Sequence, residues 1–466
     1  MNEKAAWGVL GMGVMGTSLS RNLARKGIRL ALYNRFLQGE EEGVAAQRCI
    51  AYPELAAAQP FEDLEAFIQA LETPRKVLVM VPSGSAIELV LEQLIKFLSP
   101  GDILIDGGNS HFEATEKRAQ LFENAGISFL GMGVSGGEEG ALNGPALMVG
   151  GERKAFESLS KVLSQIAADN PQGVSCLGHF GTGGAGHYVK MVHNGIEYAE
   201  MQLLAEVYEC INSHIQPNWS LLNNWQHTNS QSYLLGITAS IVSFQDKKEL
   251  LVHQILDKTQ HKGTGSWSSI SAVAQGSPAT MIQAALNARY TAAQKEYRVK
   301  MAGELPLQTV SIPLNEEVLK KAYDLARWIN HHQGFELLKA AKTTYAWSFA
   351  LSEAAKTWTA GCIIQSRLMQ ELTLILDSQE SLLETAAFKK IYAENISSLG
   401  AVLSWSLKAQ LPMPVMSAAA QYLFSIRQAN SSGNLIQAQR DYFGGHGLEW
   451  KDSREGNHGP WKQLSQ

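Results

Sequence analysis

Apolar residues form short runs in the first third of the chain and follow helical spacing after it. Four short runs predict β-strands, at Trp7–Leu10, Arg29–Asn34, Lys76–Val81 and Asp102–Asp106. Helical patterns at Thr17–Lys26 and Ser85–Leu98 lie between strands. Alternating strands and helices are typical of a parallel sheet covered by helices. We therefore expect residues 1–182 to form an α/β domain of the Rossmann type.

The pattern changes after Gly181, where turn signals become rare. Long helical patterns follow at Gly186–His214, Tyr233–Leu256, Pro278–Lys300, Asn315–Asn330, Tyr345–Leu376 and Ala386–Leu411. Residues 183–430 are thus predicted to form a large all-α domain. Residues 431–466 are a polar C-terminal tail with too few apolar residues for a core. The tail's aromatic residues are unfavourable in water, so we expect it to pack on something else, such as another subunit.

The first long helical pattern carries four polar residues on one face. They are spaced i, i+3, i+4 and i+7, as Lys190, His193, Asn194 and Glu197. Apolar residues fill the rest of the arc, so the helix is predicted to be largely buried and its polar face must meet polar groups. An amine and a carboxylate in such a place suit acid–base catalysis. A satisfied polar network in the core, or an ion-paired face, would produce the same pattern.

The first apolar run leads directly into a glycine-rich turn. The turn is Gly11, Met12, Gly13, Val14, Met15 and Gly16, and it opens a helix. Strand, glycine turn and helix in this order indicate a dinucleotide site. Gly11 permits the tight turn, Gly13 lets a pyrophosphate approach the backbone, and Gly16 lets helix and strand pack closely. The free amides at the helix N-terminus would bind the phosphates.

The end of the second predicted strand bears on which dinucleotide binds. NAD sites usually have Asp or Glu there, whereas this chain has Asn34 and Arg35. A guanidinium can bind the 2′-phosphate of NADP through paired hydrogen bonds, and an acidic group would repel it. NADP is therefore favoured, although a solvated surface arginine is the alternative interpretation.

Small and polar residues follow the later strands, whose carboxyl ends line the ligand crevice in sheets of this kind. Asn109 follows the fourth strand, and a glycine-rich stretch containing Ser135, Gly136 and Gly137 follows a further strand near Phe129. Such a stretch predicts a tight bulge or a backbone brought close to a ligand. With the hydroxyl of Ser135, it could hold a carboxylate, while a plain turn remains possible.

Two basic features in the helical part suggest an anion. The segment from His261 to Gly265, which contains Lys262, is polar and glycine-rich and suits a phosphate, though a surface turn would look the same. Arg289 lies in a helical pattern as either an ion-paired surface residue or an anion ligand.

Composition narrows the class of protein further. The chain has 466 residues, 45% of them hydrophobic and 18% charged, and a net charge of -5. This charge argues against a nucleic-acid partner, because no basic run compensates for it. No apolar run is long enough to span a membrane, and the start of the chain lacks the apolar core of a signal peptide. The four cysteines have no metal or redox spacing, which suits a reducing cytoplasm.

Taken together, these motifs resemble the decarboxylating 6-phosphogluconate dehydrogenases over essentially the whole chain. The matching segments are GMGVMG, NR, DGGNS, GVSGGEEGA, GHYVKMVHNGIEY, KGTG, GCIIQS and QRDYFGGH. The resemblance implies oxidative decarboxylation of 6-phospho-D-gluconate to D-ribulose 5-phosphate and carbon dioxide, with NADP as hydride acceptor and no metal. It also implies a homodimer in which each tail reaches into the partner subunit.

The resemblance further implies residue roles. Lys190 would take the proton from the C3 hydroxyl, and Glu197 would protonate C1 of the enediol. The carboxylate and hydroxyls of the substrate would be held by Asn109, Ser135, Gly136, Gly137, His193 and Asn194. Its phosphate would be held by Tyr198, Lys262, Arg289, Arg440 and His446, the last two from the partner. The cofactor would contact the glycine turn, Asn34, Arg35, Phe36, Val81, Pro82, Ser83 and Asn109.

The chain departs from the family pattern near the cofactor. Pro82 and Ser83 stand where the family usually has Lys-Ala, and Phe36 stands where it usually has Thr. These changes remove a lysine and a hydroxyl, so NAD becomes possible beside NADP. The rival interpretations are a non-decarboxylating β-hydroxyacid dehydrogenase and a non-catalytic NADP-binding regulator. The length of the chain, its KGTG segment and its tail argue against the first rival. The second is disfavoured by the presence of Lys190, Glu197, Arg289, Arg440 and His446.

Overall fold

The computed structural model describes residues 3–214, 218–247, 249–259, 264–306, 315–379, 381–452 and 454–461. Its first part is an eight-stranded sheet in the order β3-β2-β1-β4-β5-β6-β7-β8. The strands are β1 (Trp7–Leu10), β2 (Leu30–Tyr33), β3 (Gln59–Phe61), β4 (Lys76–Val79), β5 (Ile103–Asp106), β6 (Ser128–Ser135), β7 (Ala146–Gly151) and β8 (Leu177–His179). All neighbouring strands are parallel except β6 and β7. The predicted Rossmann-type domain is confirmed.

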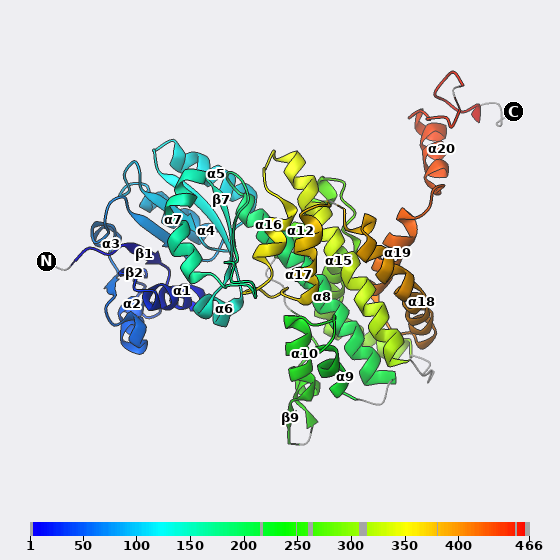
Figure 1. Ribbon diagram of the computed structural model, residues 1–466, viewed down its shortest axis with the longest axis horizontal. Helices are drawn as coiled ribbons and strands as arrows, with labels where there is room; N and C mark the ends of the chain where they lie inside the picture. Colours follow the sequence, from blue (N-terminus) through cyan, green and yellow to red (C-terminus); the bar gives the residue numbers. More distant parts are fainter. Residues whose placement is uncertain are drawn as a thin grey trace.

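Helices cover both faces of this sheet (Figure 1). They are α1 (Val14–Arg25), α2 (Val44–Ala51), α3 (Leu64–Gln69), α4 (Ser85–Leu94), α5 (Phe112–Glu123), α6 (Gly137–Asn143) and α7 (Arg153–Ile166). Successive residues of β1 point to opposite faces, so Val9 joins the core under α1 and α7, and Leu10 joins the core under α3, α4 and α5. The central strands are buried on both faces, which explains their continuous apolar runs.

The second part is helical and is organised around α8 (Ala185–His214), which packs on β6, β7, α12, α13 and α15. The other elements are α9 (Ser220–Trp225), α10 (Tyr233–Ser243), β9 (Gln245–Asp246), β10 (Glu249–Leu250), α11 (Leu251–Gln254), α12 (Thr264–Ala274), α13 (Thr280–Ala293), α14 (Lys295–Glu304), α15 (Glu316–Thr344), α16 (Leu351–Thr357), α17 (Arg367–Leu376), α18 (Ala386–Ala409), α19 (Pro414–Ile426) and α20 (Gly433–Gly444). Apart from one small hairpin, the described part of this domain is helical, as predicted.

Four of the predicted helical segments have different bounds. The segment 233–256 is wrong as one helix, because α10 ends at Ser243 and a hairpin of β9 and β10 follows. The segment 345–376 is also two helices: Gly361 has a φ of 63° in the connection, and Ser366 caps α17 through its side chain. The segment 278–300 divides into α13 and α14, and α15 continues past residue 330 to Thr344.

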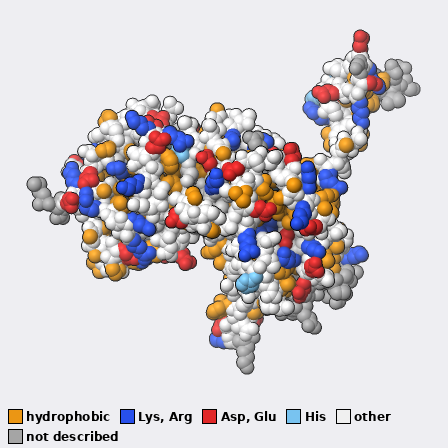
Figure 2. All heavy atoms as spheres, in the orientation of Figure 1, with side chains coloured by type: hydrophobic (Ala, Val, Ile, Leu, Met, Phe, Trp, Pro, Cys, Tyr) orange, Lys and Arg blue, Asp and Glu red, His pale blue; other side chains and the backbone are white. Residues whose placement is uncertain are grey.

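The tail is separate from the two domains. In Figure 1, α20 lies beyond α19 at the end of an extended connection, and Figure 2 shows it within a small lobe on a narrow neck. Asp441 is buried inside this lobe and accepts hydrogen bonds from the amides of Gly447 (2.9 Å) and Gly459 (2.8 Å) and from the indole of Trp461 (2.6 Å). Tyr442 and Phe443 remain 60% and 74% exposed. The tail is therefore locally ordered but leaves apolar surface uncovered.

Two features of the whole molecule bear on the predicted partners. Lys and Arg side chains are interspersed with Asp and Glu over the face drawn in Figure 2. Across the described parts of the chain, no helix combines the length and apolar character needed to cross a membrane.

Candidate active site

The polar face of α8 forms one buried cluster around His193. The Nδ1 atom of His193 lies 3.3 Å from Lys190 Nζ, 3.3 Å from Asn194 Oδ1 and 3.5 Å from Glu197 Oε2. The ring of His193 is fully buried, while the Glu197 side chain keeps one-fifth of its surface exposed. The four residues predicted to share a helix face therefore do so, and they contact one another.

The sheet contributes to this cluster through the end of β6. Ser135 Oγ lies 3.1 Å from Nε2 of His193, so both ring nitrogens have a partner. Gly136 follows with a φ of 120°, and a side chain there would meet the carbonyl oxygen of Gly361 at 2.7 Å. Gly137 is exposed, and nothing within 4 Å would obstruct a methyl group on it. The predicted group Ser135, Gly136 and Gly137 thus lies beside the polar face of α8.

Glycines in β6 and at the start of α8 let helix and sheet approach closely. A side chain on Gly133 would overlap Lys190 Cβ and lie 3.0 Å from Lys190 Cγ, and one on Gly131 would lie 2.9 Å from His187 Nδ1. Gly186, at the start of α8, lies at the same contact between helix and sheet. The group that approaches Gly133 is α8, whereas Gly131 is approached by Thr115 of α5 as well as by His187 of α8.

Burial shifts the ionisation of the cluster toward its neutral forms. Burial lowers the pKa of Lys190, and the nearby Glu197 carboxylate only partly opposes this. Burial also raises the pKa of Glu197, against the opposing charges of Lys190 and Arg289. The pKa of His193 falls well below its usual value, first because of burial and then because of Lys190. A neutral amine can accept a proton and a neutral carboxyl can donate one, so the cluster suits acid–base chemistry.

A cationic group lies at the end of this face. The guanidinium of Arg289, on α13, stacks 3.6 Å from the ring centre of Tyr198, the residue after Glu197. The structure thus joins two of the five residues predicted to hold a phosphate. Lys262 lies outside the described residues. Arg440 and His446 lie in the separate tail, and this single chain does not bring them to α8 (Figure 1).

The glycine turn after β1 has the geometry expected for close approach of a ligand. Gly11 has a φ of 97°, and a side chain there would meet the carbonyl oxygen of Met80 at 2.5 Å. A methyl group on Gly13 would meet nothing within 4 Å. Gly13 caps α1 without a side-chain hydrogen bond, so the first helix amides face outward. Gly16 packs against Gly11, as predicted. The turn fits a dinucleotide pyrophosphate.

The remaining predicted cofactor residues lie at the same edge of the sheet. Val81, Pro82 and Ser83 follow β4, and Asn109 follows β5, with Pro82, Ser83 and Asn109 exposed. Strands β1, β4 and β5 are neighbours, and the strand order reverses at β1 and β4. This is where ligands bind in open α/β sheets.

Family models match both parts of the chain. Residues 6–181 match the NAD binding domain of 6-phosphogluconate dehydrogenase, and residues 186–461 match the 6-phosphogluconate dehydrogenase C-terminal domain. The chain belongs to the 6-phosphogluconate dehydrogenase family.

The decarboxylating 6-phosphogluconate dehydrogenase of Staphylococcus aureus is 37% identical over 97% of this chain and 98% of its own. That of Lactococcus lactis is 38% identical over 98% and 99%. The solved 6-phosphogluconate dehydrogenase of Plasmodium falciparum has a TM-score of 0.91 and 32% identity, covering 98% of this chain and all of its own.

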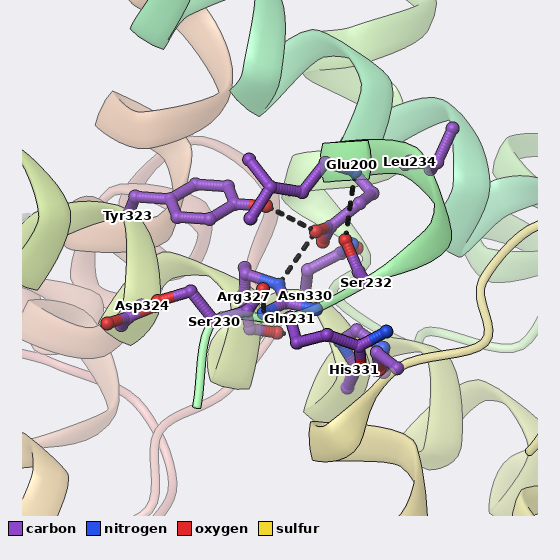
Figure 3. Close-up of polar contacts among 12 residues, drawn as sticks. Glu200, Ser230, Gln231, Ser232, Leu234, Tyr323, Asp324, Arg327, Asn330 and His331 are labelled. Atoms are coloured by element: carbon purple, nitrogen blue, oxygen red, sulfur yellow. Dashed lines mark hydrogen bonds and ion pairs between the residues drawn. The ribbon is translucent and has the colours of Figure 1, made fainter. Parts of the chain in front are cut away.

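In this member of the 6-phosphogluconate dehydrogenase family, a buried ion pair ties α8 to α15 (Figure 3). Glu200 Oε1 lies 2.7 Å from Arg327 Nε and accepts a hydrogen bond from the hydroxyl of Tyr323 at 2.8 Å. The amide of Asn330 also donates to the carbonyl of Ile196, 3.0 Å away, beside Glu197. Breaking a buried pair by removing one partner typically costs about 3–5 kcal/mol. The network therefore holds α8 in place under its polar face.

A second ion pair supports the turn that carries Asn109. Arg118 Nη1 donates to the buried carboxylate of Asp106 and to Ser110 Oγ, both at 2.9 Å. Sequence reasoning missed Arg118, Glu200 and Arg327, because each is a single charged residue in a helical pattern. Only the packing of distant elements reveals their partners.

Proposed function

We propose that the chain catalyses the oxidative decarboxylation of 6-phospho-D-gluconate to D-ribulose 5-phosphate and carbon dioxide, with reduction of NADP. The observation that carries this proposal is the buried cluster of Lys190, His193 and Glu197 beside Ser135. Membership of the 6-phosphogluconate dehydrogenase family supports it. The Plasmodium falciparum relative is described in complex with its cofactor NADP+ and in complex with its substrate 6-phosphogluconate.

In the proposed mechanism, Lys190 takes the proton of the C3 hydroxyl. NADP, which the glycine turn at Gly11–Gly16 would hold, would supply the acceptor for the hydride that leaves C3. The resulting ketone lies β to the carboxylate and receives the electrons released when carbon dioxide leaves. Glu197 then donates its proton to C1 of the enediol, which yields the ketose phosphate. Burial pushes the pKa of each group in the direction that its role requires.

The other residues position the substrate. Ser135, His193 and Asn194, with the backbone of Gly136 and Gly137, hold the carboxylate and hydroxyls, and Asn109 faces the same crevice. The stacked pair of Tyr198 and Arg289 binds the phosphate end of the substrate, together with Lys262. The shared contact of His193 with Lys190 and Glu197 keeps the two reacting groups on one side of the substrate.

The chain acts as a homodimer in which the tail, residues 431–466, reaches the partner subunit and supplies Arg440 and His446 to the phosphate. Domains 1–182 and 183–430 bind cofactor and substrate. The exposed Tyr442 and Phe443 support this arrangement, because they gain a burial site only on another surface. The four cysteines are free, which is consistent with the cytoplasm as the place of action.

The decisive experiment measures NADPH formation from NADP and 6-phosphogluconate together with carbon dioxide release. Lys190→Met should abolish NADPH formation while NADP still binds, because the base is lost and the glycine turn is untouched. Lys154→Met, an exposed lysine on α7, is the matched control and should retain full activity. Near-normal turnover of Lys190→Met would refute the base assignment. A folded wild-type protein that reduces neither NADP nor NAD would refute the proposed function.

A further inference from the structure

Arg35, which was predicted to bind a 2′-phosphate, forms an ion pair with Glu41 in the loop after β2. Glu41 Oε1 accepts a hydrogen bond from Arg35 Nη2 at 2.8 Å, and both carboxylate oxygens lie 3.3 Å from Arg35 Nε. Glu41 Oε2 also accepts from Asn34 Nδ2 at 2.9 Å. Backbone bonds in both directions between Leu37 and Glu41, at 2.9 and 2.8 Å, close the loop and set the position of this carboxylate.

The same residues connect Glu41 to the glycine turn. Asn34 Oδ1 accepts a hydrogen bond from the amide of Met12 at 3.0 Å, while its Nδ2 donates to Glu41. Asn34 is buried, whereas the side chains of Arg35 and Glu41 are 62% and 35% exposed. The carboxylate therefore faces the solvent at the end of β2, where the adenosine ribose of a dinucleotide binds in this fold.

We propose that Glu41 determines the choice between NADP and NAD in this chain. The inference rests on the proposed function, because it concerns the cofactor of that reaction. NADP must bring its 2′-phosphate to Arg35, where it meets the Glu41 carboxylate and competes with it for the guanidinium. NAD brings a 2′-hydroxyl, which can donate a hydrogen bond to the same carboxylate. Glu41 thus opposes NADP and accepts NAD, although it lies outside the strand end where an acidic residue is normally sought.

The charge of Glu41 sets the size of the effect. Its hydrogen bond to Arg35 holds the pKa of the carboxyl below its usual value, so the group is ionised at neutral pH. A unit charge about 5 Å from a phosphate dianion changes affinity by about tenfold in water at low salt. Arg35 keeps some attraction for the phosphate, so removal of the Glu41 charge should tighten NADP binding and leave NAD almost unchanged.

The test measures the dissociation constants of NADP and NAD for the ligand-free full-length protein by calorimetry at low salt. Glu41→Gln keeps the side-chain size and removes the charge; it should tighten NADP about tenfold and change NAD less than threefold. Glu40→Gln is the matched control, because it removes a charge of the same sign from the neighbouring residue. In the described contacts, the carboxylate of Glu40 forms no hydrogen bond with Arg35. The variant's ratio of NADP to NAD affinity should change by less than threefold.

Each result of these measurements either supports or overturns the proposed role of Glu41. A Glu41→Gln protein with weaker NADP binding, or with an unchanged NADP to NAD ratio, overturns the inference while the proposed reaction stands. An equal effect from Glu40→Gln also overturns it, because the effect would then come from net charge alone. Arg35→Ala should weaken NADP binding, which shows that the phosphate reaches this loop. A wild-type protein that binds neither dinucleotide would overturn the proposed function itself. Thermal melting establishes that each variant is folded.

Discussion

The close contact between β6 and α8 predicts that Gly133→Ala severely impairs catalysis. Gly133 is buried in β6 and lies directly against the side chain of Lys190. A methyl group at this position would overlap Lys190 Cβ and lie 3.0 Å from Lys190 Cγ and 3.2 Å from the carbonyl oxygen of Gly186. Neither Cβ can rotate away, since each is attached directly to the backbone. The strand and the helix must therefore separate.

The size of the effect follows from this separation. Two carbon atoms in ordinary contact are about 4 Å apart, so the helix and strand must move apart by roughly 1 Å or more. β6 is hydrogen-bonded to β5 and β7 on its two sides, which leaves α8 as the element that moves. A misplacement of about 1 Å can reduce the rate by about 100-fold, and overpacking typically destabilises a core by about 1–3 kcal/mol.

The assay compares kcat for NADPH formation with the affinity for NADP and the free energy of unfolding. We expect kcat to fall about 100-fold while NADP binding changes little, because the glycine turn lies at another part of the sheet edge. Gly400→Ala in α18 is the matched control, since a methyl group there meets nothing within 4 Å. It should retain activity and gain about 0.5–1 kcal/mol of stability. A folded Gly133→Ala protein with kcat within threefold of wild type would refute the argument about Lys190 placement.

Two further predictions concern the reaction and the tail. Glu197→Gln removes a carboxyl that, when ionised, raises the pKa of Lys190, so the acidic limb of the pH profile for NADPH formation should move to lower pH. Ribulose 5-phosphate formation by this variant should slow by about 100-fold or more. An acidic limb that moves to higher pH would contradict the assigned electrostatic coupling between Glu197 and Lys190. Arg440→Ala should raise the KM for 6-phosphogluconate about tenfold or more without a matching change for NADP, because a charged hydrogen bond to the phosphate is lost. Equal effects on both KM values would count against tail-borne phosphate binding.

Several functional features were predictable from residues close together in the chain. The glycine turn at Gly11–Gly16 was identified because strand, turn and helix follow one another directly. The face shared by Lys190, His193 and Glu197 was identified because helical periodicity alone places these residues together. Family resemblance added roles to these positions, and the family models support the same family.

Helix bounds were less predictable, because apolar spacing continues through short interruptions. The pattern at residues 345–376 continues across the break between α16 and α17, where the backbone at Gly361 has a positive φ. The same holds for the hairpin of β9 and β10 within residues 233–256. Such breaks depend on where each segment packs, and local propensity is a weak guide to them.

The sequence by itself determined the alternation of strands and helices at the start of the chain, the glycine turn and the polar face of α8, because each depends on residues close together in the chain. Only the tertiary structure decided the contacts that complete the site: Ser135 with His193, Arg289 with Tyr198, Glu200 with Arg327, and Gly133 with Lys190. These pairs join separate elements, and many pairings satisfy the same hydrophobic pattern. Which residues meet is set by how the helices pack on the sheet and on each other, and the resulting burial lowers the pKa of Lys190 and raises that of Glu197.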